Sequence, residues 1–180
     1  MRLHELYNKE VKKALKEKFG YKNEMAIPKI TKVSVNVGVG RFTKDKAYID
    51  AVANTITRIT GQKPVFTKSR KSISAFKVRE GNIVGVMATL RGERMYDFLD
   101  KLVHVTFPRV RDFRGISEKI IDRTGNMSIG FKEHLPFPEV KADEVDSIHG
   151  IEVTVTTTAK SKEEGLELFR LLGFPFKKIA

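Results

Sequence analysis

The sequence predicts an α+β protein in which an antiparallel β-sheet carries helices packed on one face. Two observations predict this class. Segments with helical and with strand periodicity are mixed along the chain without strict alternation. The strand-like segments are also amphipathic, whereas the strands of a parallel sheet buried on both faces would be uniformly apolar. A sheet covered on one face leaves its other face free, and nucleic acid can lie on such a face.

The first two helices are expected over residues 2–19 and between Thr43 and Gly61. Apolar residues recur at steps of three and four over 2–19 while lysines fill the other side, and Gly20 is expected to end this helix. Thr43 could cap the second helix, which Gly61 would end. The apolar stripe of the second helix consists of Ile49, Val52, Ile56 and Ile59.

Alternation of apolar and polar residues predicts strands at four places. In the first strand, four valines alternate with polar residues from position 33 to 39, which puts Asn36 on the face opposite the valines. Gly85 lies inside the second strand and indicates a β-bulge or a close backbone approach. The other three expected strands cover residues 82–91, 128–132 and 151–158.

Two more helices are expected in the second half of the chain. One covers residues 93–104 and is ended by Phe107 and Pro108. The last one opens with a capping box formed by Ser161 and Glu164 and ends at Gly173. The Phe-Pro-Phe sequence at 174–176 is then expected to pack back on the body of the protein.

A strongly basic stretch separates the second helix from the second strand. No acidic residue interrupts it before Glu80, and serines, Phe66 and Phe76 lie among its charges. Cations beside hydroxyl donors suit a phosphate backbone, and an aromatic ring can stack on a base. We therefore expect a protruding basic arm over about 65–81, with a solvated basic face as the alternative. The cations of this stretch are Lys63, Lys68, Arg70, Lys71, Lys77 and Arg79.

Length and charge narrow the possible functions. The 180 residues fit one domain over 1–180, and 34 basic against 22 acidic residues give a net charge of +12. Such a charge favours nucleic acid or an anionic membrane as a partner. The membrane is the weaker alternative, because no apolar run approaches the ~20 residues of a membrane span and the N-terminus has no apolar signal core. The absence of cysteine excludes disulfides and is compatible with a cytosolic setting.

The sequence predicts no catalytic residue, no cofactor, no small-molecule substrate and no metal site. A glycine pair at 38–40 is typical of a dinucleotide loop, but the third glycine position is Thr43. An SxxK match at 74–77 lacks its partner motifs. The four histidines, His4, His104, His134 and His149, are scattered without metal-ligand spacing. A nucleotide-dependent enzyme and a general DNA-binding module remain as alternatives to an RNA-binding protein.

Residues 56–72 (ITRITGQKPVFTKSRKS) resemble the signature of the universal ribosomal protein L five family. Further segments resemble parts of that family in the expected order, and the resemblance covers essentially the whole chain at the length usual for bacterial members. These segments are VNVGVG at 35–40, ATLRG at 88–92, PRVRDFRG at 108–115, FPE at 137–139 and TTTA at 156–159.

The resemblance implies a structural, non-catalytic role in the large ribosomal subunit of the cytoplasm. Family members bind 5S rRNA in the central protuberance, beside 23S rRNA and neighbouring ribosomal proteins. By motif, the contact with 5S rRNA is expected to involve Asn36, Gln62 and Thr89, with Lys63 and Arg91 beside them. All three uncharged side chains can form hydrogen bonds with RNA, although residues of this kind, Thr89 above all, are also common in ordinary strands and turns.

The resemblance also implies two further contacts. The basic arm is expected to reach peptidyl-site (P-site) tRNA, and its contacting residues would be Lys68, Arg70, Lys71, Ser72, Lys77 and Arg79. An acidic loop is expected to form an intersubunit bridge with the basic small-subunit protein S thirteen, since opposite charges attract. The acidic residues of this loop are Glu139, Asp143, Glu144 and Asp146.

Overall fold

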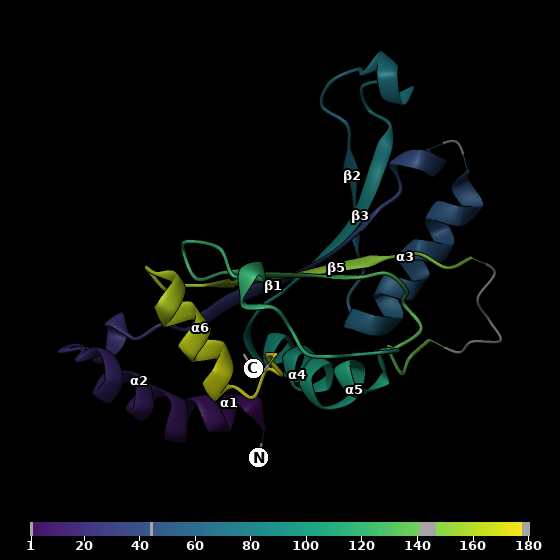
Figure 1. The fold of residues 1–180 in the computed structure, drawn as a ribbon. Coiled ribbons are helices and arrows are strands. Elements are labelled where there is room, and N and C mark those ends of the chain that lie inside the picture. The colour runs from purple at the N-terminus through teal and green to yellow at the C-terminus, as the bar shows by residue number, and fades with distance from the viewer. Residues whose placement is uncertain (1, 44, 141–146, 178–180) are drawn as a thin grey trace. The chain divides into compact units, whose positions relative to one another are not determined.

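The structure, a computed structural model, describes residues 2–43, 45–140 and 147–177. Its sheet has five strands in the order β2-β3-β1-β5-β4 (Figure 1). Hydrogen bonds join Thr158 N to Lys29 O and Val39 N to Val84 O, which pairs the end of one strand with the start of its neighbour. The sheet is antiparallel, so the predicted α+β class is confirmed. The strands are β1 (Ile30–Gly38), β2 (Val65–Lys68), β3 (Ile83–Leu90), β4 (Met127–Phe131) and β5 (Ile151–Thr157).

The chain divides into two compact units, and each is described by itself. The first unit consists of Met1–Val33, Leu90–Ile129 and Thr154–Ala180. The second unit consists of Ser34–Thr89 and Gly130–Val153, and it contains most of the predicted binding residues. A single domain over 1–180 therefore stays a prediction.

The first helix of the first unit runs from Leu3 to Phe19, as predicted. It consists of α1 (Leu3–Leu6), a π-helical stretch (Tyr7–Val11) and α2 (Lys12–Phe19). Gly20 ends it in the left-handed conformation, with φ at +67°, which a glycine adopts without steric cost. The residues that make its buried stripe are Leu3, Tyr7, Val11 and Leu15.

The second long helix of this unit continues past the expected end at Pro108. It consists of α4 (Gly92–Lys101), a π-helical stretch (Leu102–Thr106) and α5 (Phe107–Arg109). Proline clashes with the carbonyl four residues earlier in a regular α-helix, and here that position lies inside the wider π-helical stretch. The helix therefore tolerates Pro108 and ends at Arg109.

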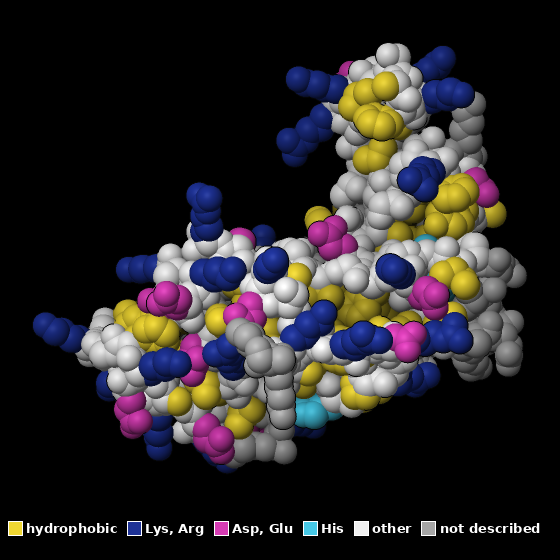
Figure 2. Space-filling model, viewed as in Figure 1, with side chains coloured by type: hydrophobic (Ala, Val, Ile, Leu, Met, Phe, Trp, Pro, Cys, Tyr) yellow, Lys and Arg dark blue, Asp and Glu magenta, His cyan; other side chains and the backbone are white. Residues whose placement is uncertain are grey.

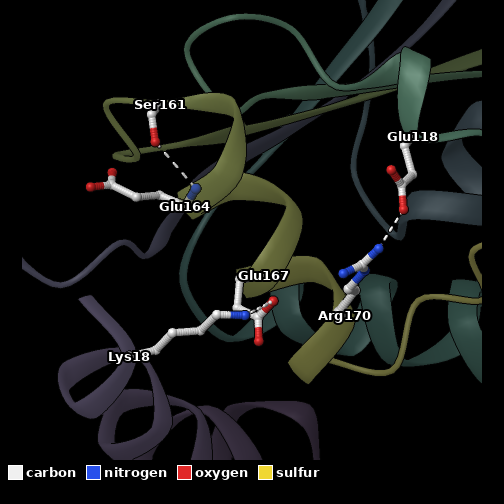
Figure 3. Close-up of polar contacts among 6 residues, drawn as sticks. All are labelled: Lys18, Glu118, Ser161, Glu164, Glu167 and Arg170. Carbon is white, nitrogen blue, oxygen red and sulfur yellow. Dashed lines mark hydrogen bonds and ion pairs between the residues drawn. The ribbon is translucent and has the colours of Figure 1, made fainter.

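The third helix of the first unit, α6 (Lys162–Leu171), is fixed by polar contacts at several points (Figure 3). Its predicted cap is confirmed, because Ser161 Oγ accepts a hydrogen bond from Glu164 N at 3.3 Å. Lys18 on α2 forms an ion pair with Glu167 at 2.7 Å, and Arg170 forms another with Glu118. The Phe-Pro-Phe sequence that follows packs back through the buried ring of Phe174.

The second unit contains α3 (Lys46–Thr60), whose predicted stripe is fully buried. The expected cap at Thr43 is wrong. Asp45 is the N-cap, and its carboxylate accepts a hydrogen bond from Tyr48 N at 3.1 Å. A short 3₁₀ turn (Gly40–Phe42) occupies the chain before the cap. Gly61 ends the helix with φ at +65°, as predicted.

The basic stretch of the second unit connects β2 to β3. Only Val65–Lys68 is a strand, and it pairs with β3 so that Thr67 lies opposite Gly85. Beyond β2, hydrogen bonds join Ser69 N to Asn82 O at 2.8 Å and Gly81 N to Ser69 O at 3.0 Å. The connection 69–82 closes through a bridge between Ile73 and Val78 and a 3₁₀ turn (Ser74–Phe76). The protrusion of this basic loop stays a prediction.

Candidate nucleic-acid interface

Alternation along β1 puts Asn36 on the open side of the strand. Val35 and Val37 are buried, while Asn36 between them is half-buried. The same alternation on β3 places Thr89 between the buried Ala88 and Leu90. Neither the Asn36 amide nor the Thr89 hydroxyl forms a hydrogen bond within the described part of the chain, so both are free to meet a partner.

Gly85 leaves the space that this polar surface needs. A Cβ atom at Gly85 would lie 2.6 Å from Thr67 Oγ1 and 3.5 Å from Asn36 Oδ1. The pairing of β2 with β3 also shifts register between Thr67 and Lys68, opposite this glycine. The register shift agrees with the irregularity predicted at Gly85, and the closest approach there is made by the Thr67 side chain rather than by a backbone atom. Thr67 on β2 and Asn36 on β1 therefore both lie near Gly85 on β3, and only the order of the strands in the sheet shows it.

Gln62 is held at the surface by a specific contact. Its Nε2 donates a hydrogen bond to Thr89 O at 3.2 Å, which connects the turn after α3 to the end of β3. This bond fixes the orientation of the amide and leaves its oxygen and second N–H for a ligand. The structure thus brings the Gln62 side chain to the backbone of Thr89, while the role of both residues in RNA binding stays a prediction.

The two predicted cations of this set are both exposed. Lys63 follows Gln62 directly, so it lies beside the uncharged side chains. Arg91 belongs to the first unit, where it precedes α4 as its N-cap residue. Both guanidinium and ammonium groups suit phosphate oxygens, which position RNA without reading its sequence.

All the predicted arm residues are exposed at the surface of the second unit. Lys77 adopts a positive φ of 53° at the end of the 3₁₀ turn, which directs the chain back towards β3. The hydroxyl of Ser72 accepts a hydrogen bond from Glu80 N and therefore stabilises the turn. No carboxylate among residues 2–43, 45–140 and 147–177 forms an ion pair with the arm cations Lys68, Arg70, Lys71, Lys77 and Arg79.

The predicted acidic bridge is only partly visible. Glu139 is half-buried in the segment that follows Phe137. Asp143, Glu144 and Asp146 lie outside the described residues. A role of this loop in a bridge stays a prediction.

Two of the histidines that are scattered in the sequence lie together in the second unit. The rings of His134 and His149 stack with centroids 3.9 Å apart and planes 16° apart, and the two residues are 1% and 7% exposed. Burial lowers the pKa of both imidazoles, that of His149 to about 4. The pair is a packing element, since no third metal-ligating side chain joins it in the described part of the chain.

The glycine pair at 38–40 does not form a dinucleotide loop. A helix N-terminus must follow such a loop directly to bind a pyrophosphate. Here a 3₁₀ turn follows, and α3 begins only at Lys46. Among the described residues, no helix is both long and apolar enough to cross a membrane.

These features define a basic α+β protein that exposes uncharged hydrogen-bonding groups and also cations that form no ion pair with the described residues, the surface chemistry of RNA-binding proteins. Comparison with known families identifies the chain more closely. Residues 23–79 match the family model of ribosomal protein L5, and residues 83–176 match the model of the C-terminus of the same ribosomal protein family. The chain belongs to the ribosomal protein L5 family, as its motifs predicted.

Individual relatives agree with this assignment. The large ribosomal subunit protein uL5 of Halothermothrix orenii is 51% identical over 176 residues, which cover 98% of each chain. That of Desulforapulum autotrophicum is 52% identical over 97% of this chain and 98% of its own. That of Psychrobacter arcticus is 52% identical over 98% of this chain and 99% of its own. The family is a structural component of the ribosome and not an enzyme.

Proposed function

We propose that this chain is a structural constituent of the large ribosomal subunit in the cytoplasm and that it binds 5S rRNA through the open surface of its second unit. The observation that carries the proposal is the uncharged set Asn36, Gln62 and Thr89. Gln62 is fixed by its bond to Thr89 O, while the Asn36 amide is left without an internal partner in the described part of the chain. Uncharged donors and acceptors suit ribose hydroxyls and base edges, which distinguish one folded RNA from another.

Replacing Asn36 and Gln62 together by alanine tests this proposal. The double variant should bind 5S rRNA about five- to 150-fold more weakly, since each lost hydrogen bond contributes about 0.5–1.5 kcal/mol. Its thermal unfolding should stay close to wild type, because neither side chain is fully buried. The measurement is a filter-binding titration at one fixed salt concentration.

Asn54→Ala is the matched control, since Asn54 is exposed on α3 of the same unit. It should bind 5S rRNA like wild type. If the double variant and this control bound 5S rRNA with equal affinity, Asn36 and Gln62 would have no role in 5S binding. Duplex DNA that competes as well as 5S rRNA would instead favour a general DNA-binding module.

The arm and the acidic loop carry two further parts of the proposal. The exposed arm cations would contact the phosphates of P-site tRNA, and Glu139 with the acidic residues after it would face small-subunit protein S thirteen. Contacts with 23S rRNA and neighbouring proteins would complete the assembly. The unopposed charge of the arm supports the tRNA contact, because phosphate contacts need cations free of internal ion pairs.

Neutralising the arm separates its role from that of the 5S surface. Glutamine at Arg70, Lys71, Lys77 and Arg79 should lower crosslinking to P-site tRNA in intact ribosomes and leave 5S binding largely unchanged. The control carries the same loss of charge at Lys9, Lys13, Lys22 and Lys29, which are exposed in the first unit. Equal effects of the two sets on tRNA crosslinking would count against a specific arm contact.

A further inference from the structure

A broad concavity of about 1720 Å³ opens in the second unit between the 69–82 connection and the start of α3. The 3₁₀ turn before α3 contributes to one side and the arm contributes to the other. Asn36, Gln62 and Thr89 do not line it, so it is distinct from the proposed 5S surface. Its lining includes several apolar side chains that are exposed to solvent.

Aromatic rings lie on both sides of this concavity. Phe42 is 47% exposed, and its ring centroid lies 4.4 Å from that of Tyr48 on α3. Phe76 in the arm is 74% exposed, and Ile73 beside it is also exposed. Large apolar side chains that gather at a surface mark a binding site, because their exposure to water is unfavourable.

The charge of the lining is positive. Arg41, Lys77 and Arg79 provide three cations, and the serines of the arm add hydroxyl groups. Asp45 is the only acidic residue of the described lining, and its carboxylate already caps α3 through Tyr48 N. Figure 2 shows Lys and Arg side chains around a hydrophobic patch at the arm. The site therefore offers stacking surfaces and phosphate contacts within one hollow.

We infer that this concavity binds an unpaired segment of RNA, with bases stacked on Phe42 and Phe76 and phosphates held by Arg41, Lys77 and Arg79. The inference rests on the proposed RNA contact of the arm and specifies its ligand. A base inside a duplex presents no free π-face, whereas an unpaired base can stack on an aromatic side chain. The cations alone would bind the phosphates of a duplex equally well. The exposed aromatic rings are therefore what favours unpaired RNA over a duplex.

The test measures fluorescence anisotropy of a labelled octauridylate, an RNA without secondary structure, bound to the full chain at low salt. Phe42→Ala with Phe76→Ala should weaken binding at least tenfold, since stacking on one aromatic ring accounts for a five- to hundredfold change in affinity. The control, Met25→Ala with Val105→Ala, removes exposed apolar side chains of the first unit and should bind like wild type. Both aromatic side chains are exposed, so the double variant should keep the wild-type circular dichroism spectrum.

The outcomes are distinct. Equal binding of the aromatic variant and wild type would overturn the inference, as would equal competition by an RNA duplex of the same charge. An acidic, phenylalanine-containing peptide that displaces the octamer more strongly than unlabelled RNA would assign the concavity to a protein partner and also overturn it. Retained 5S binding by the aromatic variant supports a separate site. If the proposed contact of the arm with tRNA were itself wrong, the arm variant with glutamine at Arg70, Lys71, Lys77 and Arg79 would crosslink to tRNA as wild type does.

Discussion

Acidification should destabilise the second unit through the stacked histidines. The pKa of His149 falls from 6.5 to about 4, first because burial penalises the charged ring and second because His134 lies against it. The unfolded chain therefore binds more protons than the folded chain between pH 6.5 and 4. The contribution of His149 to the free energy of unfolding is therefore fully present above pH 6.5 and is lost as the pH falls towards 4.

The size of the effect follows from the shift. Each pKa unit corresponds to ~1.4 kcal/mol, so His149 contributes about 3 kcal/mol, of which about 2 kcal/mol is lost by pH 5. The burial of the residue justifies this value, because solvent screens only its small exposed part. Burial also lowers the pKa of His134, which adds loss in the same direction, although the hydrogen bond with the His149 backbone and the nearby Glu133 oppose this shift.

The perturbation is His149→Phe, which keeps a ring stacked on His134 and removes the titrating group. The Nε2 atom of His149 is buried without a hydrogen-bond partner in the described part of the chain, so an apolar ring removes a buried polar atom that no group satisfies. Urea unfolding followed by circular dichroism between pH 7.5 and 4.5 measures the slope. The variant should lose most of the pH dependence.

His104→Phe is the control. His104 is exposed on the π-helical stretch that follows α4 in the first unit, and it lies beside Asp100. This control should retain the wild-type slope. An unchanged slope in His149→Phe, or an imidazole pKa for His149 near 6.5 in an NMR titration, would refute the reasoning. Either result would mean that water reaches the stacked pair.

The remaining predictions concern substitutions at two glycines, at one helix cap and at two arm cations. Gly165→Ala should cost about 2–3 kcal/mol in urea unfolding, because its Cβ would lie 2.5 Å from Gly125 Cα in the first unit; a wild-type midpoint would show that the backbone yields. Ser161→Ala should cost about 1 kcal/mol by loss of the α6 cap, and Ser161→Asp should keep the stability. Gly85→Ala should weaken 5S binding several-fold in a filter assay, because its Cβ would lie 2.6 Å from Thr67 Oγ1 and displace that side chain beside Asn36, and unchanged affinity would contradict this. Arg70→Gln with Lys71→Gln should reduce the salt slope of tRNA binding by about 1.5–2, measured by titration at several salt concentrations.

Much of the fold could be predicted because periodicity and local signals agree there. The strands at β1, β3, β4 and β5 lie where alternation placed them, and Gly20, Gly61 and Ser161 end or begin helices as expected. These signals are local, so one sequence contains them. The cap of α3 was misplaced because Thr43 and Asp45 are both good caps, and only the 3₁₀ turn decides between them.

The features that could not be predicted depend on contacts between distant residues. The stacking of His134 on His149 joins positions 15 residues apart, and the approach of both Thr67 and Asn36 to Gly85 depends on which strands are neighbours. The ring of Phe113, which lies among the arginines at 109–114, stacks on Phe107 with the ring centroids 5.2 Å apart and is part of the packing. Composition cannot distinguish a ring that packs from one that binds.

The proposed selection of 5S rRNA by such a basic chain depends on the division between charged and uncharged groups. A net charge of +12 attracts any polyanion, and cations alone give an affinity that depends on salt but hardly on the partner. Selection requires groups whose hydrogen bonds depend on geometry, and the structure holds these by internal constraints, namely the Gln62 bond to Thr89 O and the space over Gly85. Removing arm cations should therefore change mainly the salt dependence of tRNA binding. Removing Asn36 and Gln62 should instead change the preference of the chain for 5S rRNA over other RNA.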